Sequence, residues 1–355
     1  FARGELHFRL DGERPHWAAT DERGAWLLGR VDGLTPFGRL ADEYRTRYGL
    51  APAKAWLDLH EFLRDALRHD LLRPEPFPRE DYPGRDRYLR PESLREFWVH
   101  LLQTCNLACT HCLVSSGPDG EKGSTTGFYK EILAQAAELG AHRFFFTGGE
   151  PMVRPDFFEL ARFATEELKA ELIVLTNATL FKGEKAKELE RLDRERVRFQ
   201  VSVDGASPFT NDAIRGKGSF QSATQGLRFL ASLGFQTSVT TVVTTENLED
   251  LPRITRLARE LGIRTQHLMW PHRRGRIVGS HPAFPEAGQI IRAVREVKRA
   301  ADDLGVQVDN LESVKRRVNG RPGVKYALGN ACWDSLCVYY DGAVYPSAAL
   351  ANFRP

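Results

Sequence analysis

The sequence of 355 residues has no apolar stretch that could cross a membrane and almost no excess charge of either sign. A membrane helix needs about 20 consecutive apolar residues, and no run approaches that length. Nothing near the N-terminus combines a basic start with an apolar signal core. Fifty basic residues against forty-seven acidic ones give a net charge of +3, which argues against nucleic acid or membrane partners. We therefore expect a soluble, cytoplasmic protein.

Cysteine is scarce and unevenly placed. The chain has five cysteines, an odd number that does not suit a disulfide framework. In a reducing compartment, clustered cysteines more often bind metal. Three of them lie in the stretch TCNLACTHCLV, as Cys105, Cys109 and Cys112. Their spacings of four and three bring the thiols around one point, which favours a metal-binding loop over core packing.

The first 73 residues read as a small winged-helix-like α+β domain. LHFRL (6–10) and AWLLGRV (25–31) resemble short strands, and Asp32-Gly33 supplies a turn. Thr35-Pro36 suggests a helix cap with proline at the first helical position. Two helical faces follow, one formed by Phe37, Leu40, Ala41 and Tyr44, the other by Trp56, Leu59, Leu63, Ala66 and Leu67.

Residues 74–93, rich in proline and charge, read as a linker, and residues 94–284 alternate strand-like and helix-like segments. Six βα units of this kind predict an α/β fold, a partial (β/α)6 TIM-like barrel with chemistry at the carboxyl ends of its parallel strands. Residues 285–355 form a short α/β extension with a hairpin at Asp341-Gly342. Because the chain starts at Phe1 and stops at NFRP, we also expect that it is a fragment. The expected strands are residues 94–102, 142–148, 171–177, 198–205, 236–243 and 264–270.

The three clustered thiols suit an iron–sulfur cluster better than zinc. A structural zinc site closes with four ligands, and the only local fourth candidate, His111, is adjacent to Cys112. Three thiolates on one short loop instead suit a four-iron cluster that keeps one iron open. The cysteine loop follows the first barrel strand, so it should lie at the catalytic edge.

The spacing C-x3-C-x2-C, with His111 at the usual aromatic position, resembles the signature of radical S-adenosylmethionine (SAM) enzymes. This resemblance implies a 4Fe-4S cluster held by Cys105, Cys109 and Cys112, with SAM bound to the open iron. It also implies reduction of SAM to a 5'-deoxyadenosyl radical that abstracts hydrogen from a substrate. A reductase or a flavodoxin-like protein would donate the electron.

A second motif lies after the next strand, in RFFFTGGEPMVRPDF. Gly148, Gly149, Glu150 and Pro151 match the family's GGEP motif. Glycine lets the backbone approach a ligand closely, and Glu150 could pair with the amine of SAM. The alternative is a glycine turn before a helix that begins near Pro155.

Further matches are individually weaker. In the family, polar residues at the next two strand ends contact the ribose and the methionyl carboxylate of SAM. Each is equally typical of a strand-end polar residue or a helix cap. The matching positions are Thr176, Asn177, Ser202, Asp204 and Arg215. Leu268 and Met269, at the sixth strand, could flank the adenine, but core packing is the favoured alternative for both. The segment WPHRRGR, with His272, Arg273, Arg274 and Arg276, is expected to be a solvated basic loop; contact with substrate is the alternative.

The two ends of the chain point to a peptide substrate. Residues 1–73 resemble PqqD-like domains, which bind the leader of a precursor peptide as an added strand. Cys332 and Cys337 lie where related enzymes carry SPASM or twitch extensions, which implies ligands of an auxiliary iron–sulfur cluster. Buried thiols or half of a zinc site remain alternatives for this pair.

We therefore predict a radical SAM maturase of a ribosomally made precursor peptide. The tail YALGNACWDSLCVYYDGAVYPSAALAN resembles maturases of nitrogen-fixation-type leaders, including spliceases that excise tyramine at a Tyr-Gly step and work with a small accessory protein. Thioether formation and C–C crosslinking stay open, as does action on a small molecule or a folded protein. The non-enzymatic alternative is a cysteine-bound metal scaffold with a peptide-binding module.

Overall fold

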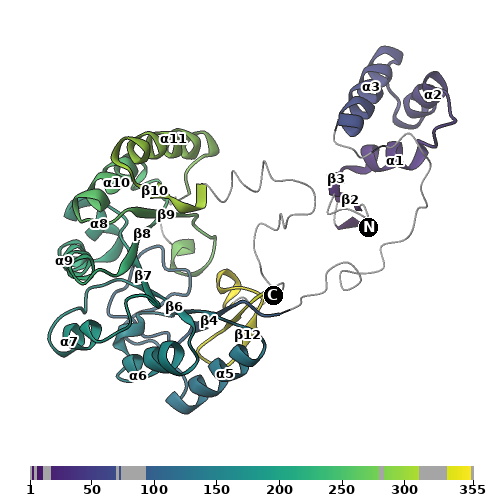
Figure 1. Cartoon of the computed structure of the whole chain (residues 1–355). Helices are drawn as coiled ribbons and strands as arrows, with labels where there is room; N and C mark the ends of the chain where they lie inside the picture. The colour runs from purple at the N-terminus through teal and green to yellow at the C-terminus, as the bar shows by residue number, and fades with distance from the viewer. Residues whose placement is uncertain are drawn as a thin grey trace. The chain divides into compact units, whose positions relative to one another are not determined.

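The computed structural model describes residues 2–3, 6–10, 17–68, 72, 93–279, 284–311 and 334–352 (Figure 1). These residues fall into two compact units, one up to residue 72 and one from residue 93. No helix of the described residues is long and apolar enough to cross a membrane.

The N-terminal unit pairs a small antiparallel sheet with three helices. The sheet contains β1 (Ala2–Arg3), β2 (Leu6–Leu10) and β3 (Trp17–Thr20). It is followed by α1 (Glu22–Arg30), α2 (Phe37–Tyr48) and α3 (Pro52–Arg68). Buried apolar side chains of the three helices form the core of this unit, among them Leu27, Leu40, Tyr44 and Leu59.

Two local predictions for this unit are wrong. Residues 25–31, predicted as a strand, lie almost entirely in α1, because the side chain of Asp21 caps this helix by accepting a hydrogen bond of 2.8 Å from the Gly24 amide. The cap of α2 is Pro36 rather than Thr35, whose amide donates to Asp32 instead. On α3 the predicted apolar stripe is only partly buried, because two of its members, Trp56 and Leu67, are 48% and 58% exposed.

The second unit contains the predicted run of parallel strands. The strands β4 (Glu96–His100), β5 (Arg143–Thr147), β6 (Glu171–Thr176), β7 (Val197–Ser202), β8 (Gln236–Val242) and β9 (Thr265–Met269) lie side by side in chain order. All their pairings are parallel, and the sheet stays open (Figure 1). The partial barrel predicted from the βα alternation is therefore confirmed.

Helices and short turns connect these strands. The α-helices are α5 (Thr126–Glu138), α6 (Phe157–Arg162), α7 (Glu184–Glu190), α8 (Pro208–Arg215), α9 (Ser219–Ser232), α10 (Leu251–Glu260) and α11 (Ala287–Leu304). The short turns are η1 (Pro151–Val153), η2 (Phe163–Glu167, a π-helix), η3 (Leu248–Asp250), η4 (Gly275–Gly279) and η5 (Ala348–Leu350).

Alternate side chains of each strand divide between the core and the interior of the barrel. Phe144 and Phe146 of β5 are fully buried in the core, whereas Phe145 between them lines a cavity. The same alternation on β6 places Val174 in the core and Ile173 in the cavity lining. The inner residues of six neighbouring strands therefore build one continuous site.

The C-terminal segment extends both edges of the barrel sheet. β10 (Gln307–Val308) pairs parallel with β9, and β11 (Ser335–Val338) pairs parallel with β4 at the opposite edge. β12 (Val344–Tyr345) runs antiparallel to β11, joined through the predicted hairpin at Asp341-Gly342. This pairing places Cys337 beside Trp98, next to the first barrel strand.

Candidate active site

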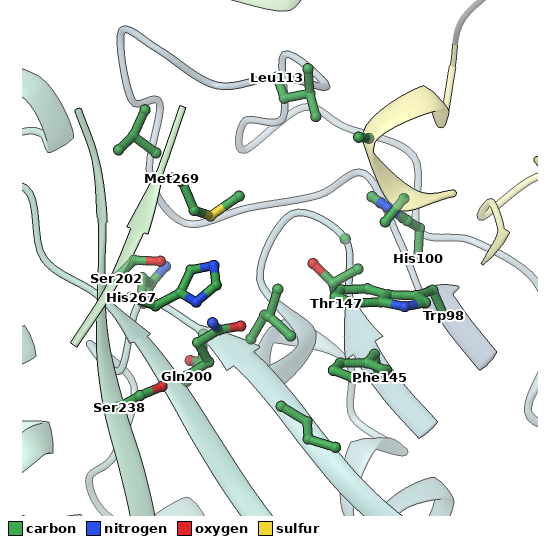
Figure 2. Close-up of a pocket in the computed structure, with 18 of the residues that line it drawn as sticks. Trp98, His100, Leu113, Phe145, Thr147, Gln200, Ser202, Ser238, His267 and Met269 are labelled. Carbon is green, nitrogen blue, oxygen red and sulfur yellow. The ribbon is translucent and has the colours of Figure 1, made fainter. Parts of the chain in front are cut away.

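A cavity of about 940 Å³ lies between the inner faces of β4 to β9 and the loop that follows β4. Figure 2 shows the part of its lining that comes from the strands. Eleven predicted site residues line it: Cys105, Cys109, Cys112, His111, Gly148, Gly149, Thr176, Asn177, Ser202, Arg215 and Met269. Four others, Glu150, Pro151, Asp204 and Leu268, lie behind the lining, and Leu268 is fully buried in the core.

The three clustered thiols share this cavity but differ in their surroundings. Cys105 Sγ accepts from the Leu107 amide at 3.4 Å, and Cys112 Sγ accepts from the Ser116 amide at 3.3 Å. Burial raises the pKa of Cys105 to about 12, and burial also raises the pKa of Cys109 although a nearby arginine opposes it. Binding as thiolates therefore requires a positive metal centre at this site.

The donor set fits a cluster rather than one ion. Within residues 93–279 and the other described ranges, no three His, Cys, Asp or Glu side chains are placed to hold a single metal ion. A four-iron cluster takes each thiolate on a separate iron, so its ligands need not converge. Three thiols that line one cavity of this size therefore fit a cluster with a ligand bound beside it.

The glycines of the GGEP motif contact the cysteine loop itself. A Cβ atom on Gly149 would lie 2.1 Å from the carbonyl oxygen of Thr104, and the Gly149 amide donates to Leu102 O at 2.8 Å. The Glu150 amide donates to Thr104 O at 3.1 Å. Glycine is therefore needed here because two backbone segments approach each other closely. The sequence had suggested that the close approach was to a ligand.

Glu150 braces the ends of two neighbouring strands. Its carboxylate is 1% exposed and accepts hydrogen bonds from the Met152 amide, the Thr176 hydroxyl and the Asn177 amide at 3.1, 2.8 and 2.7 Å. Burial raises its pKa. Asn177 in turn donates to Asn106 Oδ1 at 2.9 Å, in the cysteine loop. These residues hold the rim of the cavity in shape, and a direct contact of Glu150 with SAM stays a prediction.

A buried ion cluster lies next to Cys109. Asp204 is fully buried, and its Oδ2 atom lies 2.6 Å from both Arg215 Nε and His111 Nε2. Its Oδ1 accepts from the Val242 amide at 2.8 Å. Arg215 Nη1 lies 3.9 Å from Cys109 Sγ. Both carboxylate oxygens of Asp204 are therefore occupied by protein groups. Through these contacts Asp204 orients Arg215 and His111, which line the cavity.

The segment after β9 holds the cysteine loop in place, so the expectation of a solvated basic loop is wrong for two of its arginines. Arg276 donates to the carbonyl oxygens of Cys109 and Ser116, both at 2.6 Å, and its amide donates to Cys112 O at 3.0 Å. Arg274 donates to the carbonyl oxygens of Ala349 and Ala351. The basic run WPHRRGR was the only signal in the sequence, and it does not indicate which backbone carbonyl oxygens its arginines bind.

We expect Arg276→Met to loosen the cysteine loop. Hydrogen bonds from a charged donor contribute about 1.5–3 kcal/mol each, so the loss of even one should raise alkylation of Cys109 by iodoacetamide in the metal-free protein by at least about tenfold. Arg273→Met is the matched control, because Arg273 packs over the Phe284 ring at 5.1 Å. Mass spectrometry of the alkylated peptides measures both rates, and equal rates would refute the assigned role.

Arg154 is a second brace that sequence reasoning missed. It lies directly after the GGEP motif in PMVRPDF, is 8% exposed and donates to the carbonyl oxygens of Leu101, Lys122 and Ser124 at 3.0–3.2 Å. It also forms a two-pronged ion pair with Asp156. Arg154 therefore holds together the two ends of the segment that carries the cysteines, Leu101 before them and Lys122 and Ser124 after them.

The second cysteine pair is described only in part. Cys337 is fully buried and packs with Val114, Tyr339 and Ala351, and burial raises its pKa to about 12. Cys332 lies outside the described residues. An auxiliary cluster at this pair therefore stays a prediction.

The open barrel and the cysteine-lined cavity at the carboxyl ends of its strands define an enzyme fold with a cofactor site. The sequence profile of the radical SAM superfamily matches residues 99–258. Fe-coproporphyrin III synthase of Methanosarcina barkeri is 30% identical over 294 residues, which cover 74% of this chain and 72% of the synthase. Mycofactocin maturase MftC of Mycolicibacterium smegmatis is 37% identical over 163 residues, which cover 46% of this chain and 41% of the maturase.

The fold is similar to that of SuiB from Streptococcus suis, in a crystal structure with its bound precursor peptide SuiA. The TM-score is 0.61 at 16% identity, over 99% of this chain and 84% of SuiB. The chain spans less than half the length of several curated relatives that it matches. The chain belongs to the radical SAM superfamily. Its cofactors are a 4Fe-4S cluster and SAM, which the residues around the cavity fit.

Proposed function

We propose that this protein is a radical SAM maturase that modifies a ribosomally made precursor peptide. The observation that carries the proposal is the convergence of three cysteine thiols and the buried Arg215 on one cavity at the carboxyl ends of the strands. Peptide substrates are supported by identity to a mycofactocin maturase and by a fold shared with SuiB over nearly the whole chain.

The residues of the cavity have distinct tasks in this proposal. When bound, the reduced cluster supplies the electron that cleaves SAM into methionine and the 5'-deoxyadenosyl radical, which abstracts hydrogen from the peptide. Arg215, held by Asp204, offers its remaining guanidinium donors to the carboxylate of SAM. Ser202 and Met269, at the ends of β7 and β9, face the cavity where the ribose and adenine would lie.

The other parts of the chain complete the proposal. The N-terminal unit, residues 1–73, would bind the leader peptide, residues 74–93 would link it to the barrel at 94–284, and residues 285–355 would hold an auxiliary cluster. Tyramine excision at a Tyr-Gly step is the reaction we favour, ahead of thioether formation or C–C crosslinking. A small accessory protein and a flavodoxin-like electron donor are the further partners proposed.

A small-molecule substrate is the second candidate. It is favoured by the Fe-coproporphyrin III synthase, because the match covers 72% of that enzyme. The N-terminal unit separates the two candidates: a peptide maturase needs it for leader binding, whereas an enzyme for a small molecule has no such need.

The experiment is anaerobic reconstitution of the full chain with iron and sulfide, followed by reduction in the presence of SAM. We expect 5'-deoxyadenosine in the product mixture. Removal of residues 1–72 should leave this uncoupled cleavage intact and abolish binding of the precursor peptide encoded beside the gene. Zinc without iron, and no 5'-deoxyadenosine, would instead support a metal scaffold.

A further inference from the structure

The cavity has two walls of different chemistry. Midway along β4, β5 and β6 its lining has three apolar side chains in register, Trp98, Phe145 and Ile173, with His100 and Thr147 at the carboxyl ends of their strands and Arg143 and Glu171 at the first positions of theirs. The rings of Trp98 and Phe145 stack with their centroids 3.9 Å apart and their planes within 2° of parallel. On β7, β8 and β9 the lining is polar, with Gln200, Ser238 and His267 the main contributors. Figure 2 shows these two groups facing each other across the cavity.

Most side chains of the polar wall have no internal partner. In the part of the chain that the structure describes, the side chains of Gln200, Ser202 and Ser238 make no hydrogen bond. His267 Nδ1 lies 2.7 Å from Asp309 Oδ1, which leaves Nε2 for another partner. Glu150 and Asp204, by contrast, are occupied by internal hydrogen bonds. These half-exposed groups along one wall of the cavity are therefore free to bind a ligand.

The charges that line the cavity are already compensated. Arg143 pairs with Glu171 and Glu96, at 2.7 and 3.4 Å, and Arg198 pairs with Glu171, so two cations face two carboxylates. Arg215 is paired with Asp204, and Asp309 with His267. A substrate carboxylate would therefore find no unpaired cation on these strands, since Arg215 belongs to α8 and is already assigned to the carboxylate of SAM. A neutral group suits this environment, because burying an unpaired charge is costly.

We propose that the cavity binds one neutral apolar or aromatic residue of the peptide substrate, an inference that rests on the proposed function. Its side chain lies against Trp98, Phe145 and Ile173. Its backbone N–H and C=O bind Gln200, whose amide offers both an acceptor and a donor, and His267. His267 and Gln200 lie two residues before Met269 and Ser202 on their strands, about 7 Å deeper than the rim where SAM is proposed to bind.

The test uses blocked pentapeptides, acetyl-Gly-Ala-X-Ala-Gly-amide, with Phe, Leu, Asp or Lys at X. Saturation-transfer NMR on the full chain, loaded with cluster and SAM but kept oxidised, reports weak binding without turnover. We expect the Phe and Leu peptides to bind and the Asp and Lys peptides to bind at least about tenfold more weakly. A neutral hydrogen bond contributes about 1 kcal/mol, so its loss in Gln200→Leu should weaken Phe peptide binding by about fivefold.

Gln135→Leu is the matched control, since Gln135 is exposed on α5 and bonds only to Glu131. It should leave binding unchanged. Equal binding of the four peptides, no binding of any, or identical affinities in all variants would each overturn the inference. Formation of 5'-deoxyadenosine is measured separately, so it can fail while the peptide preference holds, and the reverse also applies.

Discussion

Cys109→Ala is expected to lower the rate of 5'-deoxyadenosine formation by more than about a thousandfold, because two remaining thiols cannot hold the cluster. Cys109 is the thiol nearest Arg215, with 3.9 Å between its sulfur and Nη1. Among the described cysteines none replaces it: Cys337 packs in an apolar cluster that Cys112 touches, but it does not line the cavity. Iron analysis, the visible absorption of the cluster and product chromatography measure the loss.

Cys337→Ala is the matched control for this change. It removes a fully buried thiol that does not itself line the cavity. SAM cleavage should therefore be retained, and any iron that this variant loses would come from the auxiliary site alone. Persistent SAM cleavage in Cys109→Ala, or the same loss in both variants, would contradict the assignment of the cluster loop.

The barrel was predictable because its signals are local and repeated. Each strand of the second unit is a short run of β-branched or aromatic residues that precedes a helical pattern, and this alternation leaves few topologies. The cysteine loop was equally predictable from the sequence, since three thiols within eight residues have few structural explanations. The first unit was harder: residues 25–31 have an apolar run that fits a strand, and only the capping side chain of Asp21 decides for a helix.

The roles of individual site residues could not be predicted, because they depend on contacts across long stretches of sequence. Arg276 reaches a carbonyl 167 residues away, and Glu150 accepts hydrogen bonds from residues 26 and 27 positions later. The sequence patterns predicted that polar residues lie at the strand ends, but they did not predict the hydrogen-bond partners of those residues. The unpaired side chains, such as Gln200, are recognised only once the internal partners of the others are known.

Asp204→Asn is expected to lower the free energy of unfolding of the barrel unit by about 3–5 kcal/mol at pH 7, the cost of leaving a buried charge without its partner. Burial acts to raise the pKa of Asp204, but Arg215 and His111 outweigh it and lower this pKa to about 2, from an ordinary value of 3.8. A depressed pKa stabilises the fold above the ordinary value and loses that contribution as the pH falls towards 2. The difference between the two proteins should therefore be full at pH 7 and pH 5 and smaller at pH 3.

Urea denaturation of the metal-free protein at these three pH values, followed by circular dichroism, measures the difference. Asp302→Asn is the control, because Asp302 forms an exposed ion pair with Lys298 one helical turn away and should contribute no more than about 0.5 kcal/mol. The asparagine keeps the shape of the site and can still accept from the Val242 amide, so the loss isolates the negative charge. An Asp204→Asn variant as stable as the control at pH 7 would mean that Arg215 finds another counter-charge, and its place beside Cys109 would then need a different explanation.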